Sequence, residues 1–171
     1  GAPFIYYGDE IGMRYVEGLK SVEGGYNRTG SRSPMQWDDS TNAGFSSAPA
    51  SDLYIAMDPD KDRPTAKKEM AAPDSLYHEV KKLIRIRQSH KALQSRGKIT
   101  FVYAEKNAYP LAYIREDGDE KILVIINAAA EAKTFACDAE PKEAIYNFGA
   151  AAEAKNGKIT VPAQSAGFYR I

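Results

Sequence analysis

Residues 3–12 read PFIYYGDEIG, a continuous apolar run that stops abruptly at residues typical of a loop. The run Pro3–Tyr7 has no polar residue at every second place, which would mark a half-buried antiparallel strand. It therefore predicts a strand that is buried on both faces, as in a parallel sheet. Two acids framed by glycines follow at Gly8-Asp9-Glu10-Ile11-Gly12, and this composition indicates a loop.

A long irregular stretch and then a helix follow this segment. From Arg14 to about Pro73 the chain is rich in Gly, Ser, Asn, Asp and Pro and shows little periodicity, and loops of that length are usually functional or disordered. Pro73-Asp74-Ser75 then supplies a helix N-cap. An apolar stripe at helical spacing predicts an amphipathic helix after this cap; its members are Leu76, Val80, Leu83 and Ile84, with the stem of Arg87.

The period of the apolar residues changes to two from Ile99 onward, which predicts strands. Asp117-Gly118 and Asn156-Gly157 are hairpin signals between them. Many short alternating strands at this spacing predict an antiparallel β-sandwich. The expected strands are Ile99–Ala104, Leu111–Arg115, Lys121–Asn127, Lys133–Cys137, Ala144–Phe148, Lys158–Val161 and Gly167–Ile171.

Composition excludes several classes of function. The 23 basic and 23 acidic residues cancel, so the chain lacks the basic excess that a nucleic-acid or anionic-membrane partner requires. No segment reaches the roughly 18 apolar residues of a membrane span. The single cysteine, Cys137, allows no internal disulfide. Because His78 and His90 have no recognised ligand spacing, we expect no metal and no cofactor.

Several motifs, in order, resemble the α-amylase family, glycoside hydrolase family 13. Gly1–Met13 is similar to the last barrel strand of that family. Ser31–Asp38, followed by Asn42–Phe45, resembles the loop after that strand in oligo-1,6-glucosidases, α-glucosidases and trehalose-forming relatives. Asp74–Arg87 resembles the last barrel helix, and the alternating tail resembles the C-terminal sandwich.

This resemblance implies a mixed fold with two parts. Residues 1–94 are expected to form the final βα unit of a (β/α)8 barrel, with its strand, long active-site loop and last helix. Residues 95–171 are expected to form the antiparallel β-sandwich. A start at Gly1-Ala2-Pro3, without an initiator Met, is what we expect of a piece of a longer protein.

The resemblance implies a retaining hydrolase or glucosyltransferase of α-glucans or α-glucosides, of which this chain is the C-terminal fragment. The family's nucleophile Asp, acid/base Glu and third Asp lie on earlier strands, the third in an Asn-His-Asp segment. Here His78 precedes Glu79 and His90 precedes Lys91, so we expect no catalytic residue in this chain. Asp9 and Glu10 are neighbours in a segment expected to be extended, so they should point to opposite faces and not flank one bond.

Supporting roles remain for three residues. The resemblance implies that Glu10 and Arg32 shape the sugar subsite beside the cleavage point, and Arg28 matches a second basic position of the same loop. A guanidinium can hold two neighbouring sugar hydroxyls or brace a carboxylate. Arg32 can equally pin its loop through a structural salt bridge. Trp37 can stack on a sugar ring or pack within the loop.

Other interpretations stay open at this point. The segment between Gly12 and Arg28, with Glu23-Gly24-Gly25-Tyr26, is shorter than we expect for a dedicated oligoglucosidase, which leaves α-amylase, α-glucosidase and glucosyl transfer as activities. The alternative is a non-catalytic carbohydrate-binding or structural sandwich, for which Tyr103, Tyr109 and Tyr113 are the candidate platform. In either case an apolar run without neighbouring strands favours non-native self-association; its residues are Pro3, Phe4, Ile5, Tyr6 and Tyr7.

Overall fold

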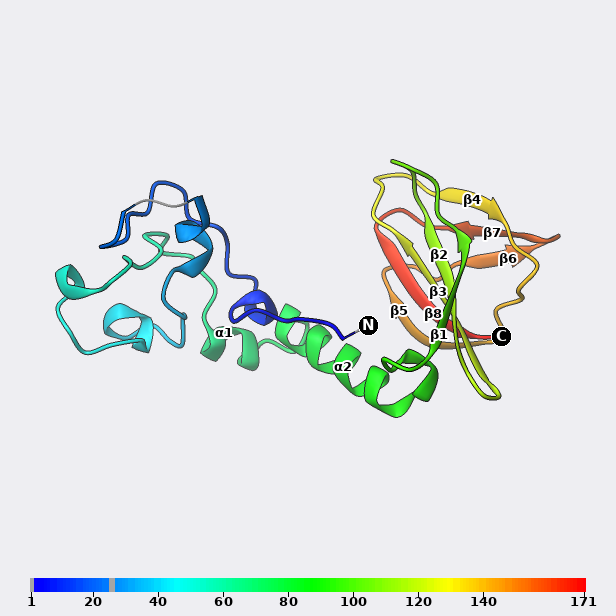
Figure 1. The fold of residues 1–171 in the computed structure, drawn as a ribbon, viewed down its shortest axis with the longest axis horizontal. Helices are drawn as coiled ribbons and strands as arrows, with labels where there is room; N and C mark the ends of the chain where they lie inside the picture. Colours follow the sequence, from blue (N-terminus) through cyan, green and yellow to red (C-terminus); the bar gives the residue numbers. More distant parts are fainter. Residues whose placement is uncertain (1, 25–26) are drawn as a thin grey trace. The chain divides into compact units, whose positions relative to one another are not determined.

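The computed structural model describes residues 2–24 and 27–171. Gly1, the first residue of the strand-like motif, and Gly25-Tyr26 of the short loop lie outside the described residues. Internal contacts divide the chain into two compact units, one with Pro3–Ile84 and one with Arg85–Ile171. This division falls within helix α2 (Leu76–Ser89; Figure 1), whereas the domain boundary expected after residue 94 stays a prediction.

The unit Pro3–Ile84 is built mainly from loops and short helical turns. Its described α-helical elements are α1 (Ala66–Ala71) and the first part of α2. The α2 N-cap is the predicted Ser75, whose Oγ accepts the backbone N–H of His78 at 3.4 Å. Four 3₁₀ turns complete the unit, namely Asp9–Ile11, Asn27–Arg32, Thr41–Gly44 and Ala50–Asp52.

The strand predicted at Pro3–Tyr7 is not formed among the described residues, and its place in a barrel stays a prediction. The segment has no regular structure, and the side chain of Phe4 is 97% exposed. A strand requires a hydrogen-bonding neighbour, and none of the described residues pairs with this segment. The apolar stripe of α2 is only partly covered: Val80 and Leu83 are half-buried, whereas Leu76 and Ile84 are 46% and 40% exposed.

We expect the purified chain to self-associate through this uncovered run. Phe4, Ile5, Tyr6 and Tyr7 are all exposed, and an apolar segment with unpaired backbone promotes pairing with a second copy. Light scattering should show a concentration-dependent mass increase that Phe4→Asp reduces. A strictly monomeric chain whose residues 3–7 are protected from hydrogen exchange would contradict this expectation.

The unit Arg85–Ile171 contains two antiparallel sheets that share a core, as a β-sandwich requires. Figure 1 shows one layer with the order β1-β2-β3-β8-β5 and a smaller layer with the order β4-β7-β6. The core between them includes Leu123, Ile125, Phe135, Ile159 and the buried Cys137. The strands are β1 (Lys98–Tyr103), β2 (Leu111–Asp117), β3 (Glu120–Asn127), β4 (Lys133–Ala136), β5 (Glu143–Phe148), β6 (Glu153–Lys155), β7 (Lys158–Val161) and β8 (Ser165–Arg170).

The seven strands predicted from the sequence are present, with ends that differ by at most two residues. The sequence prediction missed β6, which pairs with β7. Asn156 and Gly157 join these two strands with φ angles of 52° and 70°. Two successive positive φ angles are those of the type I′ turn that this dipeptide favours, so the hairpin signal was correct even though its first strand was not recognised.

The segment after α2 is held by side chains of the β2–β3 hairpin. Arg115 is buried, and its guanidinium donates to the carbonyls of Ala92, Gln94 and Gly97 at 3.1, 2.6 and 2.9 Å. The carboxylate of Glu120 accepts the Ala92 N–H at 2.8 Å and lies 2.6 Å from Nδ1 of His90. These bonds attach residues 90–97 to the five-stranded sheet.

We expect Glu120→Gln to destabilise the sandwich by about 1.5–3 kcal/mol at neutral pH, because hydrogen bonds to a charged group are lost. Burial raises the pKa of Glu120, but the bonds from Ala92 and His90 outweigh it, so the folded-state pKa is lowered from 4.5. A carboxyl with a depressed pKa contributes stability that is present above its unfolded-state pKa and is lost as pH falls through the folded-state value. Urea unfolding should therefore show the difference at pH 7 and its disappearance well below pH 4.5.

Asp119→Asn is the control for this pair of measurements. Asp119 neighbours Glu120 and forms an exposed ion pair with Lys91 at 2.9 Å, and exposed pairs contribute little. We expect this variant to unfold like the original chain at both pH values. A Glu120→Gln effect that does not change with pH would contradict the assigned role of the carboxylate.

Candidate functional site

A cavity of about 470 Å³ lies in the unit Pro3–Ile84. Three segments that are far apart in the sequence form its wall: the turn after the N-terminal run, the loop that carries the tryptophan, and the stretch before α1. The lining residues are Tyr7, Glu10, Arg32, Pro34, Met35, Trp37, Phe45, Tyr54 and Ile55. The structure thus brings together Glu10 and Arg32, two of the three residues that the sequence analysis assigned to substrate binding.

The turn that carries Glu10 is fixed by its own acids. The Asp9 carboxylate accepts the Tyr6 N–H at 2.9 Å, and the Glu10 carboxylate accepts the Gly8 N–H at 2.9 Å. Gly8 has a φ of 90°, and a Cβ there would lie 2.5 Å from Sδ of Met13, so this position requires glycine.

Asp9 and Glu10 lie in a 3₁₀ turn, Asp9–Ile11, and not in an extended chain. The expectation that they point to opposite faces of an extended chain was therefore wrong in its premise. Local hydrogen bonding, in which both carboxylates satisfy backbone N–H groups of the preceding residues, favours the turn. Asp9 thus stabilises the turn, and Glu10 combines such a role with its position in the cavity wall.

The loop after Arg32 is held by bonds at several points. The Tyr7 hydroxyl donates to the Ser33 carbonyl at 3.0 Å. The Gln36 side chain, which is 1% exposed, donates to the Pro64 carbonyl at 2.6 Å. The backbone of Trp37 donates to Ala43 at 2.8 Å and accepts from Lys67 at 2.9 Å. The side chains on this part of the wall therefore project from a fixed backbone.

Arg32 is exposed, and no salt bridge joins it to another residue among those that the structure describes. Its positive charge nevertheless acts on Tyr7, another residue of the cavity wall. Burial raises the pKa of Tyr7, as does the neighbouring Tyr6, whereas the charge of Arg32 lowers it. The structural salt bridge considered for Arg32 is thus not formed within residues 2–24 and 27–171.

Other predicted residues lie elsewhere. Arg28 is not among the described residues of the cavity wall; its carbonyl accepts the Ser31 hydroxyl at 2.8 Å in the 3₁₀ turn Asn27–Arg32. Trp37 lines the cavity and is 51% exposed, so its ring is open to a ligand. The sequence analysis did not assign Tyr7, Phe45 and Tyr54 to the site. Phe45 belongs to the motif Asn42–Phe45, which was recognised as part of the loop although Phe45 itself was not assigned to the site.

Two of the three candidate sandwich tyrosines, Tyr103 and Tyr113, do not share one platform. Tyr103 packs against Phe135 of the core with ring centroids 5.4 Å apart. Tyr113 lies 6.1 Å from Phe101 and packs against the other apolar cluster of the five-stranded sheet. Because these two rings serve different clusters, they cannot present one flat surface to a sugar.

A second cavity of about 450 Å³ lies in the sandwich beside the β6–β7 hairpin and is lined largely by exposed polar residues. Within residues 2–24 and 27–171, no three His, Cys, Asp or Glu side chains gather so that they could hold a metal ion. None of the helices in that part of the chain has the length and apolar character needed to cross a membrane.

Comparison with known proteins gives consistent matches. The family model of the α-amylase catalytic domain matches residues 1–96. The glucan 1,6-α-glucosidase of Streptococcus pneumoniae is 29% identical over 95% of this chain and 34% of its own length. The oligo-1,6-glucosidase of Bacillus cereus is 32% identical over 79% of this chain and 28% of its own length.

Solved structures show the same likeness. A mutant of trehalulose synthase MutB, from crystals soaked with trehalulose, superposes over 100% of this chain and 36% of its own, with a TM-score of 0.82 and 26% identity. MutB from Pseudomonas mesoacidophila covers 84% of this chain with a TM-score of 0.70 and 30% identity, over 26% of its own length. The chain spans about a third of the length of these relatives.

Proposed function

The chain belongs to the α-amylase family, and on that premise we propose that it forms the C-terminal part of an enzyme that hydrolyses or transfers α-linked glucosyl units. In this proposal residues 1–94 are the final βα unit of the barrel and residues 95–171 are the C-terminal sandwich. The family match over residues 1–96 supports it, because that range contains the whole cavity wall. Named relatives are glucosidases, and one MutB structure contains the substrate sucrose.

The observation that carries the proposal is the position of Glu10 and Arg32 in one cavity beside Trp37. A guanidinium can hold two adjacent hydroxyls in its fork, and an indole ring can stack on the apolar face of a sugar. We assign Glu10 and Arg32 to the binding of an α-glucoside. Arg28 keeps the binding role implied by its match to the loop motif.

The nucleophile and the acid/base are proposed to lie outside this chain. Retaining glycoside hydrolysis needs two carboxyl groups about 5–5.5 Å apart on either side of the scissile bond. Glu10 is the single acid among the described lining residues, and its carboxylate already accepts a backbone bond from Gly8. The chain therefore contributes substrate contacts to a site whose chemistry belongs to other residues.

A chimeric enzyme tests this function. We would replace the matching C-terminal segment of the Bacillus cereus oligo-1,6-glucosidase with this chain and measure glucose release from isomaltose and maltose. The proposal predicts turnover by the chimera and none by the truncated relative that lacks the segment. A chimera with a cooperative thermal transition but no turnover on either sugar would contradict the proposal.

A further inference from the structure

Arg14 and Asp58 form an ion pair that joins two of the segments from which the cavity is built. The Arg14 guanidinium donates to both oxygens of the Asp58 carboxylate, from Nε at 2.9 Å and from Nη2 at 2.7 Å. The Asp58 side chain is 2% exposed, whereas that of Arg14 is 52% exposed. Because a two-point bond of this kind fixes the orientation of both groups as well as their distance, the pair can hold two parts of the chain in one relative position.

Arg14 lies in a short segment that connects the two charged residues of the cavity wall. The turn that carries Glu10 ends just before Arg14. The Val16 N–H donates to the Gly30 carbonyl at 3.0 Å, in the 3₁₀ turn that ends at Arg32. A Cβ at Gly30 would collide with the Val16 carbonyl, so this close approach requires glycine. The position of the segment around Arg14 therefore determines where Glu10 and Arg32 lie.

Asp58 belongs to the segment that supplies another part of the wall. Tyr54 and Ile55 line the cavity and lie just before it in the sequence. The Asp58 carboxylate also accepts the Asp60 N–H at 2.9 Å. Burial raises the pKa of Asp58, but the bonds from Arg14 and from the Asp60 N–H outweigh it, so the pKa is lowered from 3.8. The carboxylate is therefore charged at neutral pH, where the ion pair is intact.

The stretch that begins at Asp58 also supports the loop with Trp37. The Gln36 side chain donates to the Pro64 carbonyl, and the Lys67 N–H donates to the Trp37 carbonyl, as described above. A displacement of this stretch would therefore change the surroundings of the Trp37 ring.

We propose that the Arg14–Asp58 ion pair positions the walls of the cavity for the binding of an α-glucoside. Neither residue is among the described lining residues, so the pair acts through the side chains that it places and not through contact with the substrate. Without it, the segment before Asp58 separates from the segment that holds Glu10 and Arg32. This inference rests on the proposed function, since it names the residues that position the binding site of that function.

Quenching of Trp37 fluorescence by acrylamide tests the positioning on the purified chain, without any ligand. Trp37 is the only tryptophan of the chain and lines the cavity. The double variant Arg14→Gln/Asp58→Asn removes both charges and keeps side chains of similar size. We expect its quenching constant to rise by up to about twofold, because the 51% exposed ring becomes open on its second side when the walls separate.

The single variant Arg14→Gln separates positioning from a merely stabilising role. It leaves the buried Asp58 carboxylate without its partner, so it should lower the thermal transition as well as raise the quenching constant. If the pair only compensates a buried charge, the double variant should quench like the original chain, and that result would overturn the inference. Arg14→Lys keeps the charge without the fork and should give intermediate quenching, so it replaces Arg14→Gln if that variant does not fold.

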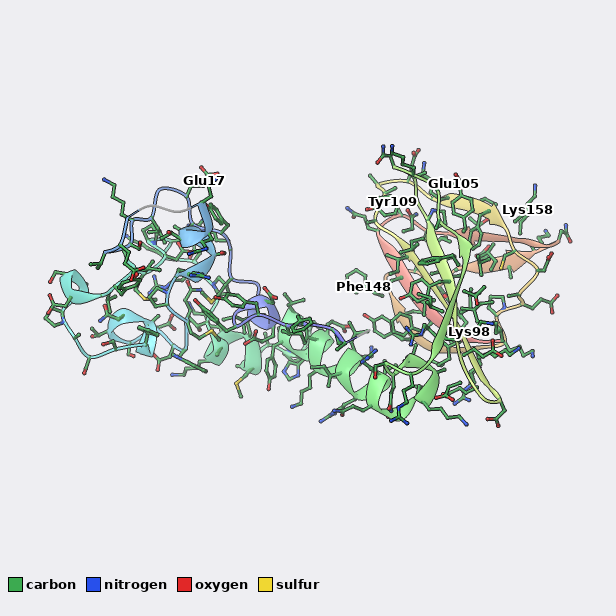
Figure 2. The ribbon with its side chains drawn as sticks, viewed as in Figure 1. Glu17, Lys98, Glu105, Tyr109, Phe148 and Lys158 are labelled. Carbon is green, nitrogen blue, oxygen red and sulfur yellow. The ribbon has the colours of Figure 1, made fainter. Side chains whose placement is uncertain are left out.

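Two control variants remove a charge elsewhere. Glu17 is exposed three residues after Arg14, and Figure 2 labels it at the outer edge of the N-terminal unit. Arg170, whose side chain is 50% exposed, forms an ion pair with Glu143 in the sandwich at 3.1 Å. Glu17→Gln and Arg170→Gln should both leave the quenching constant unchanged. An increase in either that equals the effect of the double variant would overturn the assignment to the Arg14–Asp58 pair.

The chimeric enzyme tests the consequence for the substrate. The double variant should raise KM for maltose and isomaltose by roughly tenfold with a smaller change in kcat, because binding groups are displaced while the catalytic carboxyl groups are proposed to belong to other residues. An active chimera whose KM does not change overturns this inference alone. A folded, inactive chimera overturns the proposed function, and the quenching of Trp37 then still decides whether the pair positions the cavity walls.

Discussion

We expect the isolated chain, incubated with starch, maltose or isomaltose, to release no reducing sugar. Glycosidases owe rate enhancements of many orders of magnitude to a correctly spaced pair of carboxyl groups, so the loss is expected to be complete. In this chain the neighbouring acids Asp9 and Glu10 accept backbone bonds from Tyr6 and Gly8 in a tight turn. A reducing-sugar assay over several hours, at protein concentrations far above those used for an active relative, measures this outcome.

Two variants separate true activity from contamination in that assay. Asp9→Asn and Glu10→Gln each remove one acid and keep a side chain of similar shape. Sugar release by the purified chain that either substitution abolishes would show that this turn performs catalysis and would overturn the expectation. Release that is unchanged in both variants comes from another protein in the preparation.

The sandwich was predictable because its signals are local. Alternation of apolar residues follows the pleat of a half-buried strand, and Asn156-Gly157 specifies its own turn. Strand β6, with the sequence Glu153-Ala154-Lys155, was missed because all three residues are exposed and none is β-branched or aromatic. Helix α1 was missed for a related reason: it is only six residues long and buries none of them.

The N-terminal unit was less predictable because its apolar patterns depend on neighbours. Pro3–Tyr7 has the composition of a strand buried on both faces, but the described residues supply no strand beside it. The sequence therefore shows which residues are apolar, whereas the neighbours that a strand buried on both faces needs are not among the described residues. The same holds for α2, whose helix and cap were predicted correctly but whose apolar stripe is only partly covered.

The site was recognised only in part. Glu10 and Arg32 could be named because they belong to ordered motifs, and the structure places both in one cavity. Phe45 and Tyr54 lie in the irregular segment between Asp38 and α1. Such a segment has no periodicity from which the position of its side chains in the fold could be predicted. The 3₁₀ turn at Asp9 was missed because it depends on side-chain bonds to Tyr6 and Gly8 that a strand-based reading does not consider.

Arg32→Ala in the chimeric enzyme should lower kcat/KM by roughly ten- to a hundredfold while the sandwich stays folded. Arg32 lines the cavity and forms no salt bridge with another described residue, so its guanidinium is available to sugar hydroxyls. Loss of a charge-assisted hydrogen bond costs on the order of 1.5–3 kcal/mol, which corresponds to that change in rate if the bond is made in the transition state.

Linkage discrimination distinguishes this role from a structural one. If Arg32 contacts the leaving-group sugar, the losses on maltose and isomaltose should differ, because the two linkages place that sugar differently, and the melting temperature should not change. Arg96→Ala, which removes an exposed arginine from the segment before β1, should affect neither substrate. Equal losses on both sugars together with a lower melting temperature would instead show that Arg32 only stabilises its loop, since a loosened loop weakens every substrate alike.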